Sequence, residues 1–354
     1  MTRLDSLYID GVRNLSAQQI SLSPGLNFFC GLNGAGKTSV LEAVYLLSRG
    51  RSHRALTARG LIQRDRDVAL VRANAGSSVI AIERRLSSWI ARQDGEDIPS
   101  LAQLARILPV VMFHPESHGA FLTESDQRRR LLDWTVFHVE PGFAGAWSAY
   151  QRALKQRNAA LSSNKPRDAL LWDAALAEPG ETLTRMRAST VAALHPAFLT
   201  AHAELAGLPD TVALEWRSGW DSSLSMRQAL VAAWERDTAL GYSSVGAHRC
   251  DLLMSALRLR AAGTLSRGEG KLAVLALTLA ASEIVKKALD QPLLVLLDDI
   301  AAELDPPRFA RLLSLLSDAK HQVLATAVEP PILASWRGER ALFHVEQGRI
   351  SRVL

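Results

Sequence analysis

The sequence has little cysteine and no long apolar run, and each absence excludes a class of protein. Cys30 and Cys250 are its only cysteines, and they lie far apart. This argues against a disulfide-stabilised secreted domain or a cysteine-rich zinc site, so we expect a reducing cytoplasm. The longest apolar stretch, Leu272 to Ala281, is about ten residues long, too short to cross a bilayer. Residues 1–10 include acids where a signal peptide has an apolar core, so we expect neither export nor a membrane span.

The overall composition is that of an ordinary folded protein. Hydrophobic residues make up 48% and charged residues 22% of the 354 residues, which excludes a disordered chain and favours two domains or lobes. The formal net charge of +5 permits a polyanionic partner without requiring one. Basic residues concentrate in two segments, 49–66 and 128–167. The first has six arginines and a single acid, Asp65.

Apolar periodicity predicts an α/β lobe at each end of the chain and a helical region between them. The N-terminal lobe is expected to contain a hairpin over 3–10 and 19–30, a strand at 26–30, a helix at 38–48, and strands at 68–72 and 79–86 joined by a turn at 74–77. The middle of the chain is expected to form helices over 125–205, a strand around 211–220 and a further helical stretch that ends near 240. A strand at 252–260, a helix at 269–288 and strands at 293–297 and 323–327 are expected to follow. All-apolar strands such as the one at 293–297 are typical of a parallel sheet buried on both faces.

A glycine-rich loop between the strand at 26–30 and the following helix fits the pattern GxxxxGK[ST] at every fixed position. Its residues are Gly31, Leu32, Asn33, Gly34, Ala35, Gly36, Lys37 and Thr38. Such a loop wraps a phosphate with backbone N–H groups, its lysine reaches the β- and γ-phosphates, and its threonine hydroxyl binds Mg²⁺. The sequence therefore predicts an ATP and Mg²⁺ site here. The alternative is a chance glycine-rich turn.

The apolar strand at 293–297 ends in two acids and predicts a Walker B motif. Asp298 is expected to hold Mg²⁺, and Asp299 to orient the attacking water. A core strand that ends in a surface acid pair is the alternative. Glu303 and Asp305 follow, and these acids have a second interpretation as helix caps before Pro306.

A third motif, Leu265 to Glu269, opens the apolar helix before the Walker B strand. Its serine and glycine lie at a helix N-terminus, where anions are favoured. It resembles the signature motif of ABC-type ATPases, in which the motif covers the nucleotide of a second subunit; a plain helix N-cap is the alternative. Lys37 and Ser266 are 229 residues apart, more than in a transporter subunit and far fewer than in a true SMC protein.

Three further strings make the chain similar to the RecF family of bacterial recombination mediators over essentially its whole length. They are Arg128 to Trp134, Phe137 to Pro141, and Gly246 to Arg249. The resemblance implies an ABC-type ATPase head with an inserted helical arm, divided into an N-terminal lobe at 1–120, an arm at 121–207 and a C-terminal lobe at 208–354.

The resemblance also implies a function. Members bind DNA, hydrolyse ATP weakly, dimerise on ATP, prefer single-stranded, gapped or junction DNA, and work with RecO and RecR to load recombinase. Lys37, Asp298 and Asp299 would then be catalytic, and Ser266 and Gly268 would contact nucleotide across the dimer. A transporter subunit and an ATP-switched scaffold that does not bind DNA remain the alternatives.

Four positions depart from the patterns of related ATPases. Glu269 stands where glutamine is usual, and Ala247 where proline is usual. Asp299 replaces a glutamate, and Thr326 occupies the place of a transporter's histidine switch. A shorter carboxylate and a missing imidazole both weaken water activation, which predicts slow hydrolysis.

The remaining candidates concern DNA and metal. Arg51 and Arg54 follow the phosphate-loop helix closely and are predicted to contact DNA phosphates, with a solvated surface as the alternative. The histidines at 114, 118 and 138 lack metal-ligand spacing and are expected to have ordinary structural roles. Trp134 and Trp147 are expected to pack in a core rather than stack on bases.

Overall fold

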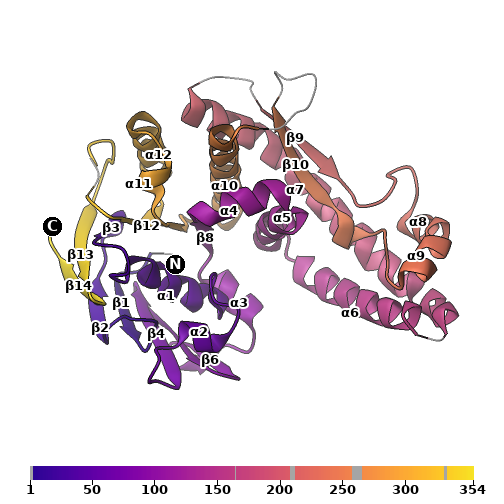
Figure 1. Ribbon diagram of the computed structural model, residues 1–354, viewed down its shortest axis with the longest axis horizontal. Coiled ribbons are helices and arrows are strands. Elements are labelled where there is room, and N and C mark those ends of the chain that lie inside the picture. The colour runs from indigo at the N-terminus through magenta and orange to yellow at the C-terminus, as the bar shows by residue number, and fades with distance from the viewer. Residues whose placement is uncertain (1–2, 164, 208–211, 257–264, 331–332) are drawn as a thin grey trace. The chain divides into compact units, whose positions relative to one another are not determined.

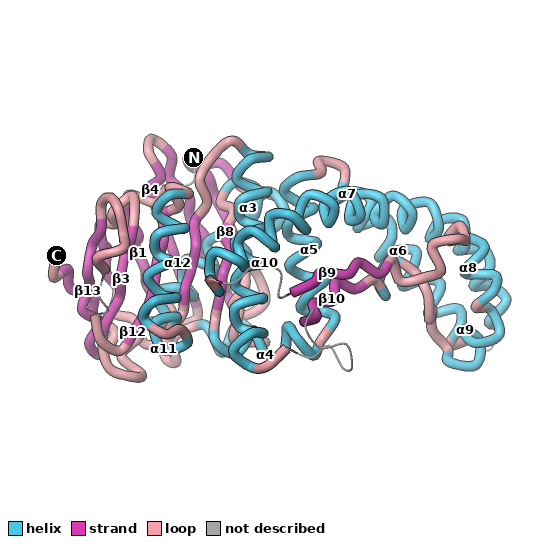
Figure 2. The backbone as a smooth tube through the Cα atoms, turned by 90° about the horizontal axis from the view of Figure 1, so that it is seen from above, coloured by secondary structure: helices cyan, strands magenta, loops and turns pink. Residues whose placement is uncertain are grey.

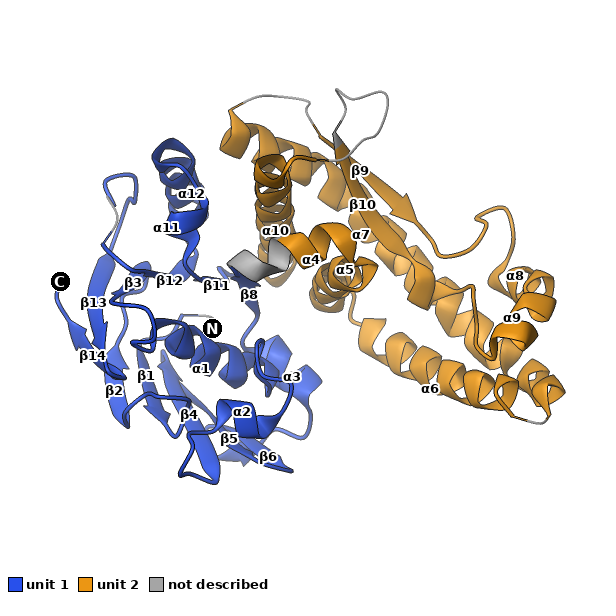
Figure 3. Cartoon of the chain, in the orientation of Figure 1, with its two compact units in different colours: residues 1–116, 290–354 blue, residues 117–289 orange. Residues whose placement is uncertain are grey.

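The computed structural model describes residues 3–163, 165–207, 212–256, 265–330 and 333–354. It divides into two compact units (Figure 3). The head unit combines residues 1–116 with 290–354, and the helical unit is residues 117–289. The two ends of the chain therefore fold together, and the helical unit is an insertion between them, as the ABC-type fold class predicts. The finer division at 120 and 207 stays a prediction. The two compact units are divided differently, since residues 208–289 belong to the helical unit and not to the unit that contains the C-terminus.

The head unit contains an antiparallel sheet in the order β2-β1-β4-β5-β6-β7. Its strands are β1 (Ser6–Asp10), β2 (Gln18–Ser21), β4 (Val68–Ala75), β5 (Ser78–Arg85), β6 (Trp89–Gln93) and β7 (Glu96–Asp97). On β4 the side chains of Ala69, Val71 and Ala73 are buried, while those between them point to the opposite face. This alternation places one face of the sheet on the core.

The second sheet of the head unit has the order β14-β13-β3-β12-β11-β8. Its strands are β3 (Leu26–Cys30), β8 (Val110–Phe113), β11 (Leu294–Leu297), β12 (Gln322–Ala327), β13 (Arg340–Glu346) and β14 (Arg349–Arg352). All neighbours pair in parallel except β13 and β14. Every residue of β3, β11 and β12 is buried, which confirms the prediction of a parallel sheet covered on both faces.

Helix α1 (Lys37–Arg49) lies between the two sheets of the head unit (Figure 1). Its buried residues Val40, Val44 and Leu47 join one hydrophobic core with residues of both sheets. The other helices of this unit are α2 (Ala58–Leu61), α3 (Leu101–Ile107), α11 (Ile300–Glu303) and α12 (Pro306–Asp318). Asp305 caps α12 by accepting the N–H of Arg308 at 2.9 Å, so the helix-cap interpretation of this acid is confirmed.

The helical unit consists of long helices and a two-stranded antiparallel sheet, which Figure 2 shows from above. Its elements are α4 (Pro115–Thr123), α5 (Ser125–Val139), α6 (Phe143–Leu161), η1 (Pro166–Trp172), α7 (Asp173–Ala206), β9 (Val212–Arg217), α8 (Met226–Ala232), α9 (Trp234–Leu240), η2 (Ala247–Arg249), β10 (Asp251–Ala256) and α10 (Arg267–Leu289). Helix α10 packs on α7 and α5, and α6 packs on α7.

Two predicted boundaries need comment. The turn expected at 74–77 was wrong in its first half, because Asn74 and Ala75 still pair within β4. Gly76, at φ 61°, allows the chain to reverse over only two residues. Of the strand expected at 252–260, residues 257–260 lie outside the described part of the chain.

Among the described residues, none of the helices combines the length and the hydropathy that a transmembrane helix requires.

Candidate functional site

The glycine-rich loop leads from β3 into α1 and depends on glycine at its two ends. Gly31 has φ 154°, and a Cβ atom there would lie 2.2 Å from the carbonyl oxygen of Val345. Gly36, the N-cap of α1, has φ 116°, which side chains rarely adopt. The first N–H groups of α1 have no carbonyl partner inside the helix, so the loop and helix end together form an anion-binding surface.

Lys37 begins α1 and its side chain folds back over the loop. Its ammonium donates hydrogen bonds to the carbonyl oxygens of Gly31 at 2.8 Å and Leu32 at 3.1 Å, and the residue is only 5% exposed. Both acceptors are neutral, so a phosphate would compete well for this cation.

Asp298 follows the last residue of β11 and contacts the loop. Its Oδ1 accepts a hydrogen bond from the Thr38 hydroxyl at 2.9 Å and another from the Thr326 hydroxyl at 2.7 Å. The Thr326 oxygen in turn accepts the backbone N–H of Asp299 at 2.8 Å. The predicted Mg²⁺ residues, Thr38 and Asp298, are therefore in contact, and Thr326 joins both Walker B acids.

Asp299 is held in an unusual conformation for a residue with a side chain. Its φ of 44° and ψ of 28° are left-handed. Its Oδ1 is buried and meets no hydrogen-bond partner among the described residues. Burial and the neighbouring Asp298 raise the pKa of this carboxyl, while Lys37 and Arg54 oppose the rise. A strained acid with an unused oxygen and a raised pKa is typical of a functional position.

Lys37, Thr38 and Asp299 line one cavity of about 490 Å³ in the head unit. The lining residues are Arg13, Asn14, Asn33, Gly34, Gly36, Lys37, Thr38, Ser39, Arg54 and Asp299. The structure thus brings the loop and the second Walker B acid to one cavity, and Asp298 is hydrogen-bonded to Thr38 of its lining. Their roles toward ATP stay predictions.

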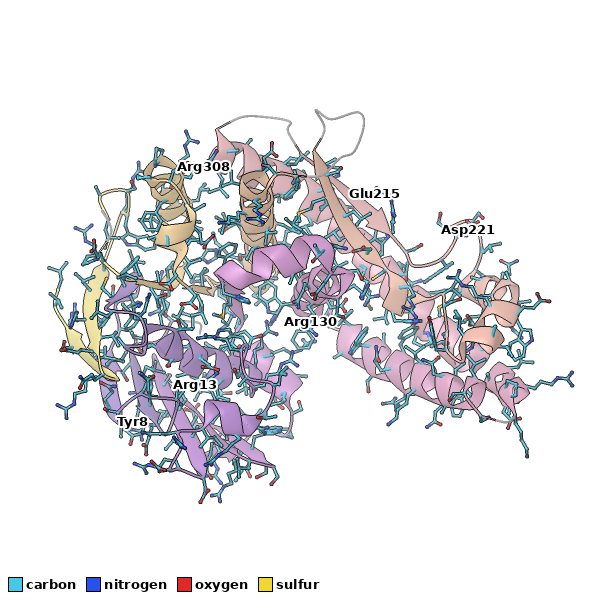
Figure 4. The ribbon with its side chains drawn as sticks, viewed as in Figure 1. Tyr8, Arg13, Arg130, Glu215, Asp221 and Arg308 are labelled. Carbon is cyan, nitrogen blue, oxygen red and sulfur yellow. The ribbon has the colours of Figure 1, made fainter. Side chains whose placement is uncertain are left out.

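Four lining residues were missed or interpreted differently from the sequence. Arg13, Asn14 and Ser39 belong to no recognised motif, but the Asn14 amide donates to the Gly34 carbonyl at 3.0 Å and accepts the Ser39 hydroxyl at 3.0 Å. Figure 4 labels Arg13 in the head unit. Arg54 was predicted to contact DNA, yet it lines this cavity. Arg51, the other predicted DNA contact, is exposed.

The signature segment lies in the helical unit at the start of α10. Ser266 and Glu269 form a reciprocal cap: the Glu269 carboxylate accepts the Ser266 N–H at 2.8 Å, and the Ser266 hydroxyl accepts the Glu269 N–H at 3.3 Å. The helix-cap interpretation of Ser266 is therefore confirmed. Gly268 is exposed, and a Cβ atom there would meet nothing within 4 Å. A role of Ser266 and Gly268 toward nucleotide stays a prediction, and is compatible with the cap.

The remaining candidates, where they are described, pack against neighbouring side chains. Trp134 and His138 are both buried and their rings meet edge to face at 5.1 Å. Trp147 is partly buried, stacks on Phe143 and lies under the Arg187 guanidinium. No cluster of three or more potential metal-binding side chains occurs among the described residues. The side chain of His118 lies outside the described part of the chain.

Comparison with known proteins gives concordant matches. A family described as RecF/RecN/SMC N terminal domain matches residues 3–351. The DNA replication and repair protein RecF of Xanthomonas axonopodis pv. citri (strain 306) is 40% identical over 98% of this chain and 97% of its own. The RecF of Stenotrophomonas maltophilia (strain R551-3) is 38% identical over 98% of each chain.

Solved structures agree on the fold. A structure of "the recombination mediator protein RecF-ATPrS in RecFOR pathway" matches with a TM-score of 0.84 at 23% identity, covering 99% of this chain and 98% of the other. The chain belongs to the RecF family of DNA replication and repair proteins, whose fold is the ABC-type ATPase head.

Proposed function

We propose that this protein is a weak ATPase that binds DNA in an ATP-dependent manner in recombinational repair and replication restart. One observation carries the proposal: the loop residues Lys37 and Thr38 share a cavity with Asp299, and Asp298 is hydrogen-bonded to Thr38. The name of the RecF relatives, DNA replication and repair protein, and the ATP in the description of a solved RecF support the same function.

The donor set beside the loop fits Mg²⁺. The Thr38 hydroxyl and the Asp298 carboxylate supply two hard oxygen ligands 2.9 Å apart, and Mg²⁺ commonly takes its other ligands from water and phosphate. When bound, the ion would neutralise phosphate charge that develops during transfer. Thr326 orients Asp298 for this role, because its hydroxyl donates to the same carboxylate oxygen.

The chain's own residues account for the rest of the chemistry. The N–H groups at the start of α1 bind phosphate oxygens, and Lys37 exchanges two carbonyl partners for phosphate. Arg54 adds a cation to the same cavity. Asp299, with its unused buried oxygen, orients the attacking water. A carboxylate one methylene shorter than glutamate reaches less far, which is in keeping with slow turnover.

The finer parts of the proposal concern partners. ATP would be held between two copies, with Ser266 and Gly268 of one copy over the nucleotide of the other. DNA that is single-stranded, gapped or forms a junction would bind a basic surface that includes Arg51. RecO and RecR are the proposed protein partners, since a solved relative is described as RecF in the RecFOR pathway. Two free, buried cysteines suit a reducing cytoplasm.

Lys37→Met tests the nucleotide assignment. The aliphatic stem remains but the phosphate-binding cation is lost, so ATP hydrolysis should fall at least about tenfold while the midpoint of unfolding stays near that of the parent. The matched control is Lys155→Met, which removes an exposed lysine of α6. Hydrolysis at the parent rate in the Lys37 variant would show that the loop does not bind ATP.

A further inference from the structure

Helix α1 carries a buried acid, Glu42, that none of the sequence motifs includes. Glu42 lies five residues after Lys37 on α1 and is 1% exposed. A carboxylate this deeply buried loses much hydration and persists only when its oxygens receive good hydrogen bonds. Its partners therefore indicate why it is there.

Arg13 is the first partner of Glu42. Its Nε donates to Oε2 at 2.7 Å and its Nη2 to Oε1 at 2.9 Å, a two-point contact that fixes both distance and orientation. Arg13 itself lines the cavity and has a left-handed backbone, with φ 50°. The acid thus holds one of the two arginines of the cavity directly.

Ser52 is the second partner and leads to the other arginine. Its hydroxyl donates to Glu42 Oε1. The Ser52 hydroxyl oxygen also accepts two backbone N–H groups, that of Arg54 at 2.9 Å and that of Ala55 at 2.7 Å. The loop after α1 is therefore pinned to Glu42 at the residue next but one to Arg54. His53, between them, packs its ring edge-on against Tyr45 of α1 at 5.3 Å.

We propose that Glu42 and Ser52 are positioning residues of the nucleotide cavity, which set the place of Arg13 and Arg54 relative to the phosphate loop. The proposal deepens, and rests on, the function proposed above. A guanidinium contributes to phosphate binding only when it is already oriented, because ordering a long side chain costs conformational entropy. Glu42 and Ser52 supply that order from the helix that also carries Lys37.

A purely structural role for Glu42 and Ser52 makes a different prediction. In that case Ser52→Ala would lower the stability of the head unit and leave nucleotide affinity unchanged. If the network acts on the cavity, the same substitution weakens nucleotide binding through Arg54. The two effects separate in a double-mutant cycle, because residues that act independently give additive changes.

The test is calorimetric titration of the full chain with a non-hydrolysable ATP analogue and Mg²⁺. Ser52→Ala should weaken binding about three- to tenfold, a change equal to the net free energy of about one ordinary hydrogen bond, and Ser52→Thr, which keeps the hydroxyl, should restore it. In an Arg54→Ala background the further effect of Ser52→Ala should fall below about twofold. The matched control is Ser100→Ala in the same unit. Ser100 caps α3, and its hydroxyl accepts the Gln103 N–H at 3.1 Å.

Glu42→Gln provides the second variant, since it keeps the shape of the acid but turns an NH₂ group toward a donor. It should weaken binding at least as much as Ser52→Ala, while Glu83→Gln, at an exposed pair with Arg85, should not. Parent affinity in Ser52→Ala, or additive effects with Arg54→Ala, would overturn the inference. Failure of the proposed function is distinguishable, because then the parent protein would not bind the analogue, or Lys37→Met would bind it equally well.

Discussion

A single hydroxyl group, that of Thr326, connects the two Walker B acids. The Thr326 oxygen lies between them, donating to Asp298 and accepting from the N–H of Asp299. Thr326 is fully buried, so water cannot replace its hydroxyl in the hydrogen bonds to Asp298 and to the Asp299 N–H. An unsatisfied buried polar group costs about 1–3 kcal/mol, which is enough to reorient a carboxylate.

Thr326→Val should therefore lower the rate of ATP hydrolysis about tenfold or more and change ATP affinity less. Valine has nearly the volume of threonine but cannot bridge the two acids, whereas Thr326→Ser should retain most of the activity. The measurement is kcat beside the Kd of a non-hydrolysable analogue. Thr278→Val, which removes a buried hydroxyl bond to Val274 in the helical unit, is the control. A valine variant with parent kcat would remove Thr326 from the mechanism.

Elements of the helical unit are joined by buried arginines and by one histidine. Arg157 of α6 is fully buried and binds Asp173 at 2.8 Å and Asp237 at 2.7 Å. The His248 ring donates from Nε2 to the Ser243 carbonyl at 3.0 Å and accepts the Tyr150 hydroxyl at Nδ1 at 2.7 Å. Because a carbonyl only accepts, these bonds fix the neutral tautomer with the proton on Nε2.

The stability of the helical unit should depend on pH through His248. Burial lowers the pKa of His248 from 6.5 to about 4, and nearby Arg249 and Arg129 act in the same direction. Protonation then favours the unfolded chain: stability is complete above about pH 6.5 and falls by up to about 3 kcal/mol as the pH drops toward 4. Denaturant unfolding of the parent and of His248→Asn across that window measures the difference. His195→Asn, at an exposed site on α7, should keep the slope of the parent; an equal slope in His248→Asn would contradict the prediction.

The start of α10 is the element on which dimerisation is predicted to depend. Ser266→Arg should still bind ATP but fail to dimerise on it, because a large cation would block the approach of a second nucleotide. Sedimentation with a non-hydrolysable analogue measures this. Ser225→Arg is a closely matched control, since Ser225 forms the same kind of capping box with Gln228 on α8. Loss of the cap in Ser225→Arg should lower the free energy of unfolding by about 1 kcal/mol, and this variant should dimerise normally. A normal ATP-induced dimer of Ser266→Arg would refute the arrangement across the interface.

Across the whole molecule, burial changes which basic residues are available to a polyanion. In the segment 128–167, Arg128 and Arg157 are buried in ion pairs with Asp251 and with Asp173 and Asp237, so they hold the unit together. In the segment 49–66, Arg49 donates to the Val110 carbonyl at 3.2 Å. Arg51 is exposed and is the better single test of DNA contact.

Arg51→Ala should weaken DNA binding to a similar degree for different sequences and reduce the salt dependence by about one phosphate contact. ATP affinity should stay at the parent value, whereas Arg54→Ala should lower it because Arg54 lines the cavity. Anisotropy titrations on gapped duplex at several salt concentrations measure the slope, with Arg349→Ala of β14 as the control. An unchanged slope and affinity for Arg51→Ala would move the DNA surface elsewhere, to the exposed cations of 128–167.

The local features of this protein could be predicted from its sequence. Three of these features are contiguous strings: the phosphate loop, the buried strand that precedes Asp298, and the helix that precedes that strand. Their backbone geometry follows from glycine, from apolar runs and from helical periodicity over a few residues. The fold class was implied by the resemblance of these strings, in this order, to those of ABC-type ATPases and of the RecF family.

Which residues from distant segments meet at the site depends on how the segments pack in three dimensions. Arg13 and Arg54 line the cavity, Glu42 binds Arg13, and the Thr326 hydroxyl donates to Asp298. These residues come from four separate segments, and no motif in the sequence predicts these contacts. Whether an arginine faces solvent, as Arg51 does, or is fully buried, as Arg157 is, depends on what packs over it. Contacts of this kind are set by the packing of segments far apart in the chain, and hydrophobic packing fixes that arrangement without leaving a periodic signal in the sequence.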